Sequence, residues 1–244
     1  MLSELKKELR SYVNPEKAAF FPRFFKTGPG EYGEGDQFLG VTVPCSRQVA
    51  KKFKDLPLND IQKLLESPWH EERLTALHIL VYRFNASKKS TPLQANENTQ
   101  KEIYTFYLEH THRINNWDLV DTSARDIVGG YIYAHHNLIL TLDKLSKSPL
   151  LWERRIAIIA TFYFLMRGDP GVTVKIANTL LFDTQDLIHK AVGWMLREMG
   201  KRCDSQTLAD FLNQHAHEMP RTMLRYAIEH LDESTRQRYL RQNE

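Results

Sequence analysis

The sequence contains little cysteine, since only Cys45 and Cys203 occur among its 244 residues. The two lie far apart and outside any CxxC spacing, so neither a disulfide framework nor a cysteine-based zinc site is expected. Long hydrophobic runs are also absent. The longest, 156–166, is interrupted by Thr161 and falls far short of the roughly 20 residues that span a bilayer. These absences predict a protein of a reducing compartment with no membrane partner.

An excess of one charge is absent too, with 33 Lys and Arg against 30 Asp and Glu and a formal net charge of +3. A histone-like polyelectrolyte is therefore excluded, and any affinity for nucleic acid must come from a localised patch of cations. The sequence also has no G-x-S-x-G motif, no phosphate-binding loop ending in GK[ST] and no G-x-G-x-x-G turn after a predicted strand. Nucleophile-elbow hydrolases, nucleoside triphosphatases and dinucleotide-binding enzymes thus have no support.

What is present suits a globular chain that buries a large core. Apolar residues make up 42% of the sequence, charged residues 26% and aromatic residues 11%, which is enough for one large domain or two small ones. The start, MLSELKKELRSYV, alternates charged and apolar residues at helical spacing and lacks the apolar stretch and cleavage site of a signal peptide. We therefore expect mature, cytoplasmic protein.

Helical periodicity dominates the chain. Nearly every long segment has apolar residues at i, i+3 and i+4, and convincing alternation with a period of two is almost absent. The pattern predicts an all-α protein. Helix starts are expected near Pro15, Pro68, Pro149 and Pro220, because the missing N–H of proline costs little in a first turn. Five glycines between 28 and 40 predict an irregular surface loop over 28–43.

A weak internal repeat has the form S-P-x-x-x-E-R-x-x-A and occurs at 67–76 and 148–157. In addition, Arg155, Lys190 and Arg225 are evenly spaced, and each is followed two residues later by a small apolar side chain. Such spacing indicates helical hairpins of about 35 to 47 residues. We predict that residues 1–244 form a single α-α superhelix of HEAT or armadillo type with a concave face. An irregular helical bundle is the alternative.

The segment 184–202, TQDLIHKAVGWMLREMGKR, has two separable faces. An apolar stripe is expected to face the core: Ile188, Val192, Met195 and Met199. A second stripe lies about 200° around the helix axis and is basic with one aromatic: Lys190, Trp194, Arg197 and Lys201. Cations interleaved with an aromatic ring suit a phosphate-bearing partner. The alternative is that the tryptophan packs under a neighbouring helix and the cations are solvated.

A second candidate segment is INNWDLVDTSARDIV at 114–128, where Asn115 or Asn116 is expected to cap a helix. Trp117 and Asp121 would then share one helix face. Asp118 would lie in the first turn, where a carboxylate stabilises the helix dipole. Asp121 lies more than a turn inside the helix, so it is either exposed, paired with a cation or used for chemistry.

A third candidate is Arg155, near the start of PLLWERRIAIIATFYFLM at 149–166, a mostly apolar segment that is expected to form one helix. An arginine among so many apolar neighbours needs a carboxylate or a phosphate, and Asp121 is a candidate partner. Three pairs of histidines have no accompanying cysteine or HExxH arrangement, so solvated side chains are favoured over a metal site. These pairs are His110 with His112, His135 with His136, and His215 with His217.

In these segments the sequence resembles the HEAT-like DNA alkylation repair glycosylases of the AlkD type. The resemblance rests on NWDLVD at 116–121, LWERRIAI at 151–158, IHKAVGWMLRE at 188–198 and MPRTMLRYAIEHL at 219–231, with NPEKA at 14–18 and FLGV at 38–41. It implies a glycosylase that removes positively charged N3- and N7-alkylated purines from duplex DNA. It also implies that the enzyme needs no metal or other cofactor and has no deep base pocket.

The resemblance assigns roles to five residues by motif position. Trp117 and Trp194 match the two aromatics that flank the deoxyribose of the lesion, and Asp121 matches the catalytic carboxylate. Arg155 matches the arginine beside that carboxylate, and Phe24 falls where the family can have a tyrosine at the DNA-facing lip. The glycine-rich stretch after Phe24 lengthens this region relative to the family pattern.

The chemistry of the residues agrees with that assignment. A cationic alkylpurine is already a good leaving group, so no general acid is required and one carboxylate suffices. As the glycosidic bond breaks, the sugar becomes oxocarbenium-like, and Asp121 with the tryptophan faces would stabilise that cation. Arg155 would keep Asp121 ionised and oriented.

Two other functions remain open. One is a non-catalytic HEAT-like module that binds damaged or branched DNA, and the other is a scaffold for protein partners. A scaffold predicts an apolar concave face, whereas cations at helical and repeat spacing predict a basic one that binds double-stranded DNA. The cations are Lys190, Arg197, Lys201 and Arg225. Nothing in the sequence indicates an oligomer, and we expect a monomer.

Overall fold

The computed structural model describes residues 1–87 and 93–242, and within them every regular element is a helix. Within these residues an isolated β-bridge joins the extended backbone at Gln37 and Trp69. The prediction of an all-α fold is confirmed. None of the helices in the described part of the chain has the length and apolar content that a membrane span needs.

The chain divides into two compact units, Met1–Ile127 and Val128–Glu244, each with its own set of packed helices. The first unit contains α1 (Leu2–Arg10), α2 (Pro15–Phe24), α3 (Val43–Lys52), α4 (Leu58–Leu65), α5 (His70–Ser87), α6 (Leu93–Glu109), a 3₁₀ turn (Thr111–Arg113) and α7 (Trp117–Ala124). Helix α5 is central in this unit, because α3, α4, α6 and α7 all pack against it. The division leaves the single repeat domain expected over 1–244 as a prediction.

The second unit is built around α13, against which α10, α12, α14 and α15 pack. Its elements are α8 (Gly130–Ala134), a 3₁₀ turn (His136–Leu138), α9 (Leu140–Ser146), α10 (Leu151–Ala160), α11 (Phe162–Leu165), α12 (Gly171–Thr179), α13 (Asp186–Arg202), α14 (Ser205–His215), α15 (Arg221–Ala227) and α16 (Glu233–Gln242). A π-helical segment, Arg125–Gly129, follows α7. The four apolar residues expected on the core face of α13 are all fully buried.

The repeat at 67–76 and 148–157 has a structural basis. The hydroxyls of Ser67 and Ser148 each accept a hydrogen bond, 3.1 Å long, from the backbone N–H two residues later. The guanidinium groups of Arg73 and Arg154 donate back to the carbonyls of the same serines, at 3.0 and 2.9 Å. Each arginine also pairs at 2.6 Å with a carboxylate from outside the motif, Asp36 and Asp183 respectively. The repeated residues thus build the turn before α5 and before α10.

The long helix expected over 149–166 is interrupted. Helix α10 ends at Ala160 and α11 begins at Phe162. The side chain of Thr161 donates to the carbonyl of Ile158 at 2.7 Å, and the backbone N–H of Thr161 reaches the same carbonyl, one residue short of helical spacing. A threonine bound to its own helix backbone competes with the regular ladder, which explains the break.

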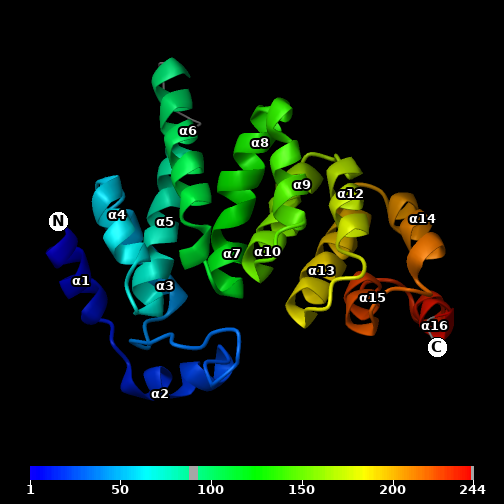
Figure 1. Ribbon diagram of the computed structural model, residues 1–244, viewed down its shortest axis with the longest axis horizontal. Coiled ribbons are helices and arrows are strands. Elements are labelled where there is room, and N and C mark those ends of the chain that lie inside the picture. The colour runs from blue at the N-terminus through cyan, green and yellow to red at the C-terminus, as the bar shows by residue number, and fades with distance from the viewer. Residues whose placement is uncertain (88–92, 243–244) are drawn as a thin grey trace. The chain divides into compact units, whose positions relative to one another are not determined.

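The irregular loop expected over 28–43 is present as turns and extended backbone between α2 and α3. In Figure 1, α2 and this loop lie at one end of α5. The buried carboxylate of Glu71 on α5 accepts hydrogen bonds from the backbone N–H groups of Leu39, Gly40 and Val41, at 2.7–3.1 Å. Gly40 has φ +78°, and a Cβ there would meet the carbonyl oxygen of Asn14 at 2.1 Å. The FLGV segment is therefore held against α5 and α2.

Candidate functional site

A cleft of about 440 Å³ opens in the first unit. Trp117 and Asp121 of α7, expected on one helix face, both line it, and so does Phe24 at the end of α2. Three of the residues singled out in the sequence are therefore brought together by α2 and α7. The walls also carry charged and polar side chains that the sequence did not single out for this site, His70 among them.

Aromatic rings form one wall of the cleft. The ring of Phe25 stacks on that of Trp117, with centroids 5.6 Å apart and planes 21° from parallel. Phe24 meets Trp117 edge-on at 5.9 Å and is 49% exposed. On its other side Phe25 stacks on Phe38 of the loop at 5.1 Å. Trp117 is thus held in place by rings and keeps a half-buried position at the cleft.

Helix α7 begins where the sequence indicated. The fully buried side chain of Asn116 accepts a hydrogen bond of 2.8 Å from the backbone N–H of Trp117, and Asn116 has extended backbone angles typical of a capping residue. This start places Trp117 and Asp118 in the first turn and Asp121 one turn later.

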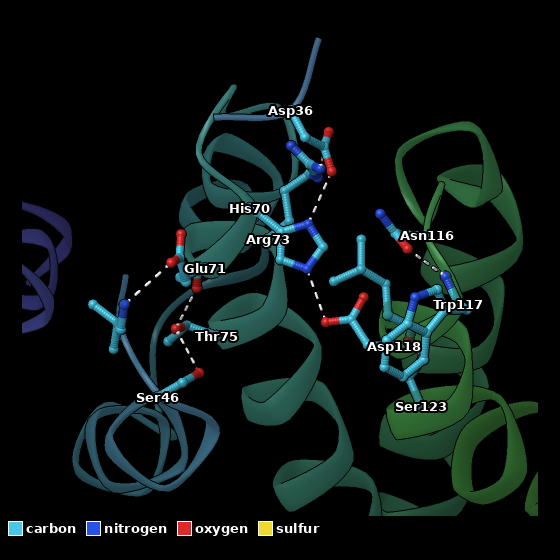
Figure 2. A network of polar contacts seen from close by, with 12 residues as sticks. Asp36, Ser46, His70, Glu71, Arg73, Thr75, Asn116, Trp117, Asp118 and Ser123 are labelled. Atoms are coloured by element: carbon cyan, nitrogen blue, oxygen red, sulfur yellow. Dashed lines mark hydrogen bonds and ion pairs between the residues drawn. The ribbon is translucent and has the colours of Figure 1, made fainter. Parts of the chain in front are cut away.

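A network of charged side chains includes two residues of the cleft wall, His70 and Asp118 (Figure 2). The His70 ring contacts two carboxylates, with Nδ1 2.9 Å from Asp36 of the loop and Nε2 2.8 Å from Asp118 of α7. Burial by itself would lower the pKa of His70, but the two carboxylates outweigh burial and raise it from 6.5 to about 9. At neutral pH His70 is therefore an imidazolium that donates from both nitrogens.

Arg73 completes this network, which we call the His70 network: Asp36, His70, Arg73 and Asp118. The guanidinium of Arg73 pairs with Asp36 at 2.6 Å. Burial opposes ionisation of Asp36, but the hydrogen bond from His70 and the charge of Arg73 prevail and hold the pKa of Asp36 below its usual range. Two cations and two anions face one another in this network, so its charges balance within the fold.

The electrostatic effect of Asp121 extends below the cleft, to Tyr107 on α6. Burial raises the pKa of the Tyr107 phenol, a hydrogen bond with Ser123 opposes the rise, and the negative charge of Asp121 adds to it. Tyr107 therefore stays neutral and hydrogen-bonds to Ser123 of α7 at 2.9 Å. This buried contact joins α6 to the face of α7 behind the cleft.

The other assigned aromatic and cation, Trp194 and Arg155, lie in the second unit. Trp194 of α13 is half-buried and contacts Phe162 of α11, with ring centroids 6.0 Å apart. Arg155 of α10 is 5% exposed and donates to the carbonyl of Leu187 at the start of α13. The partnership of Arg155 with Asp121 stays a prediction.

The basic stripe of α13 is less basic than its sequence indicated. Lys190 pairs with Asp186 of the same helix at 2.8 Å. Arg197 pairs with Glu229, which follows α15, and lies 3.5 Å from Glu198. The sequence pattern missed Glu229 because α15 brings it to α13 only in the folded unit. The other two cations expected to bind DNA, Lys201 of α13 and Arg225 of α15, are exposed.

The histidine pairs are only partly solvated, which corrects the expectation from the sequence. In each pair one ring is exposed and the other is half-buried with a hydrogen bond. The half-buried rings are His110, bound to the carbonyl of Phe106, His135, bound to that of Tyr131, and His215, bound to Glu218. Among the described residues, no three His, Cys, Asp or Glu side chains are grouped so as to hold a metal ion.

The most polar part of the site, the His70 network, was missed in the sequence. Two of its residues, His70 and Arg73, lie in the repeat motif and open a helix whose first eleven residues, 70–80, are all buried. A histidine and an arginine at the head of a buried segment need partners, and that signal was available. The partners themselves, Asp36 and Asp118, come from distant parts of the chain.

The described residues thus form an all-α fold with a cleft lined by aromatic and carboxylate side chains. A family model described as DNA alkylation repair enzyme matches residues 5–231, so the chain belongs to that family. The resemblance stated from the sequence is thereby confirmed at the level of the family. A comparison with curated protein sequences finds no match.

Two solved structures have the same fold. One, described as a predicted DNA alkylation repair enzyme from Enterococcus faecalis, is 17% identical, has a TM-score of 0.65 and covers 91% of this chain and 97% of its own. The other, AlkD2 from Streptococcus mutans, is also 17% identical, has a TM-score of 0.54 and covers 95% of this chain and 97% of its own. At this identity the likeness shows the fold alone.

Proposed function

We propose that this member of the DNA alkylation repair family is a glycosylase that hydrolyses the N-glycosidic bond of cationic N3- and N7-alkylated purines in duplex DNA. The observation that carries the proposal is the cleft in which Trp117, Asp121 and Phe24 meet. A carboxylate beside an aromatic face is the arrangement that a developing sugar cation requires.

The leaving group determines which catalytic groups the reaction needs. An alkylated purine already carries a positive charge, so it departs as a neutral base without protonation by the enzyme. The sugar left behind is electron-poor, and the negative charge of Asp121 stabilises it while orienting the attacking water. Asp121 is the carboxylate we assign to this role, because it lines the cleft one turn after Trp117 on the same face of α7.

The remaining assigned residues enter as further proposals. Trp194 is proposed as the second aromatic that flanks the deoxyribose. Arg155 is proposed as the arginine that keeps the Asp121 carboxylate ionised. Phe24, exposed at the lip of the cleft, packs against the DNA. Contacts to phosphates are proposed for four cations: Lys190, Arg197, Lys201 and Arg225.

The test is release of 3-methyladenine and 7-methylguanine from methylated duplex DNA under single-turnover conditions at low salt. We expect the wild type to release both bases. Asp121→Asn keeps the size of the side chain and removes its charge, so we expect the rate to fall by about 100- to 1,000-fold, as for other electrostatic groups in active sites.

The matched control is Asp60→Asn on α4, where the aspartate pairs with Lys63 at 3.0 Å outside the cleft. This variant should release bases at the wild-type rate. Undiminished release by Asp121→Asn would overturn the assignment of the carboxylate. No release by the wild type, together with salt-dependent DNA binding, would favour the non-catalytic DNA binder instead.

A further inference from the structure

We infer that His70 is a positioning residue for the cleft: it fixes the first turn of α7, which carries Trp117, and couples that turn to the glycine-rich loop through Asp36. The catalytic consequence of this inference rests on the proposed function. The coupling itself is a property of the fold and is measured without any substrate.

The geometry joins three segments that are distant in sequence. His70 opens α5 and is 1% exposed, Asp36 comes from the loop, and Asp118 comes from the first turn of α7. Both ring nitrogens of His70 are engaged, at 2.9 and 2.8 Å. A neutral imidazole donates only one hydrogen bond, so only the imidazolium satisfies both carboxylates.

A second route from His70 to Trp117 runs through aromatic rings. The His70 ring packs against Phe25 at 4.7 Å and against Phe38 at 5.0 Å. Phe25 in turn stacks on Trp117 at 5.6 Å. A displacement of the His70 ring therefore reaches Trp117 both through Asp118 and through Phe25.

The charges around His70 make the arrangement sensitive to its proton. The charged groups that face it are Asp36 from the loop, Arg73 from α5 and Asp118 from α7, and Arg113 of the 3₁₀ turn lies beyond Arg73. The second oxygen of Asp118, Oδ1, is buried without a hydrogen-bond partner among the described residues. Without the His70 proton, a carboxylate would face an imidazole lone pair, and the first turn of α7 would shift to relieve the repulsion.

The experiment follows the His70 imidazole and the Trp117 indole by ¹⁵N NMR from neutral pH to above the pKa of His70, with the indole signal assigned through Trp117→Phe. We expect both signals to titrate together, with a midpoint near 9. In His70→Gln the indole signal should already be displaced at neutral pH and should no longer titrate. In Asp36→Asn it should titrate with a lower midpoint than in the wild type, because His70 keeps only the Asp118 carboxylate as a partner. The second variant tests the loop without touching the histidine.

The control is His78→Gln. His78 is a second buried histidine on α5, hydrogen-bonded to Ser46 at 3.0 Å and absent from the cleft walls. Burial and the charge of Arg47 lower the pKa of His78 to about 3, so it does not titrate over this range. Its replacement should leave the indole signal of Trp117 in place.

Single-turnover release of methylated purines provides the functional readout. We expect the wild-type rate to fall as pH rises through 9, and the His70→Gln rate at neutral pH to be at least about tenfold lower, since small displacements of catalytic groups cost up to about 100-fold. DNA affinity should change less than the rate, because the cations proposed to contact phosphates lie outside the His70 network.

The possible results distinguish the positioning role of His70 from the proposed glycosylase activity. An indole signal that stays flat through the titration of His70, or a folded His70→Gln variant with wild-type signal and rate, overturns the inference. A wild type that releases no base refutes the proposed function and the catalytic part of the inference. In that case a joint titration of His70 and Trp117 still supports the positioning role.

Discussion

Single residues carry most of the chemistry at the cleft. His70 also stabilises the folded protein by an amount that depends on pH. Its pKa is about 9 in the folded protein against an ordinary 6.5. The stabilising contribution is therefore complete below pH 6.5 and is lost as pH rises through 9, with a size of about 3 kcal/mol. Denaturant unfolding of the wild type and His70→Gln across this range should show a difference that shrinks as pH rises. A difference independent of pH would contradict this linkage.

The residues predicted at this scale were those with local signals. Asn116 was one of two predicted capping residues, and the spacing of Trp117 and Asp121 placed them on one face of the helix that follows. His70 escaped because its two carboxylate partners lie in other segments. A spacing rule describes one helix at a time, whereas an ion pair between segments depends on how helices pack.

At the scale of elements, two ion pairs join α1 to α5. The Glu72 side chain on α5 is fully buried, and it pairs with Lys6 at 2.7 Å and Arg10 at 2.8 Å. Glu72→Gln removes the charge that both cations face, so we expect a loss of about 1 to 3 kcal/mol in unfolding free energy and faster hydrogen exchange throughout α1. Denaturant unfolding and hydrogen exchange measured by mass spectrometry would check both effects.

The control for α1 is Glu4→Gln, whose side chain is 71% exposed and pairs only with the chain's amino terminus among the contacts described. Exposed pairs of this kind contribute little, so the variant should match the wild type. Equal exchange of α1 in both variants would mean that apolar burial of Leu5 and Leu9, and not the buried carboxylate, holds the helix.

Helix positions were largely predictable, whereas interruptions were not. The start of α2 after Asn14 agrees with its cap, since the asparagine side chain accepts from the backbone N–H of Lys17 at 2.9 Å. The break at Thr161 has a local cause in the hydrogen bond of its side chain, but apolar spacing continues across this break and across the π-helical turn after α7, so the spacing predicts neither. Propensity locates helices, and packing decides where their hydrogen bonding changes.

At the scale of the whole molecule, DNA binding should depend on which cations remain available. Lys190 is engaged by Asp186, whereas Arg225 is exposed. We expect Arg225→Ala to weaken binding to duplex DNA and to lower the salt dependence of log K by about one ion, while Lys190→Ala changes both less. Binding titrations over a range of salt concentrations would measure these slopes. A larger effect of Lys190→Ala would mean that DNA displaces its carboxylate partner.

The sequence by itself determined the helical class, the repeated turn before α5 and α10, the family, and the placement of Trp117 and Asp121 on one face of α7. These features follow from hydrophobic period, capping residues and motif order, which are local. Only the tertiary structure decided which charges are neutralised, because Glu229 reaches Arg197, and Asp36 and Asp118 reach His70, from distant positions in the chain. Buried charges must find partners wherever packing brings them, and packing is not written in the spacing of any single helix.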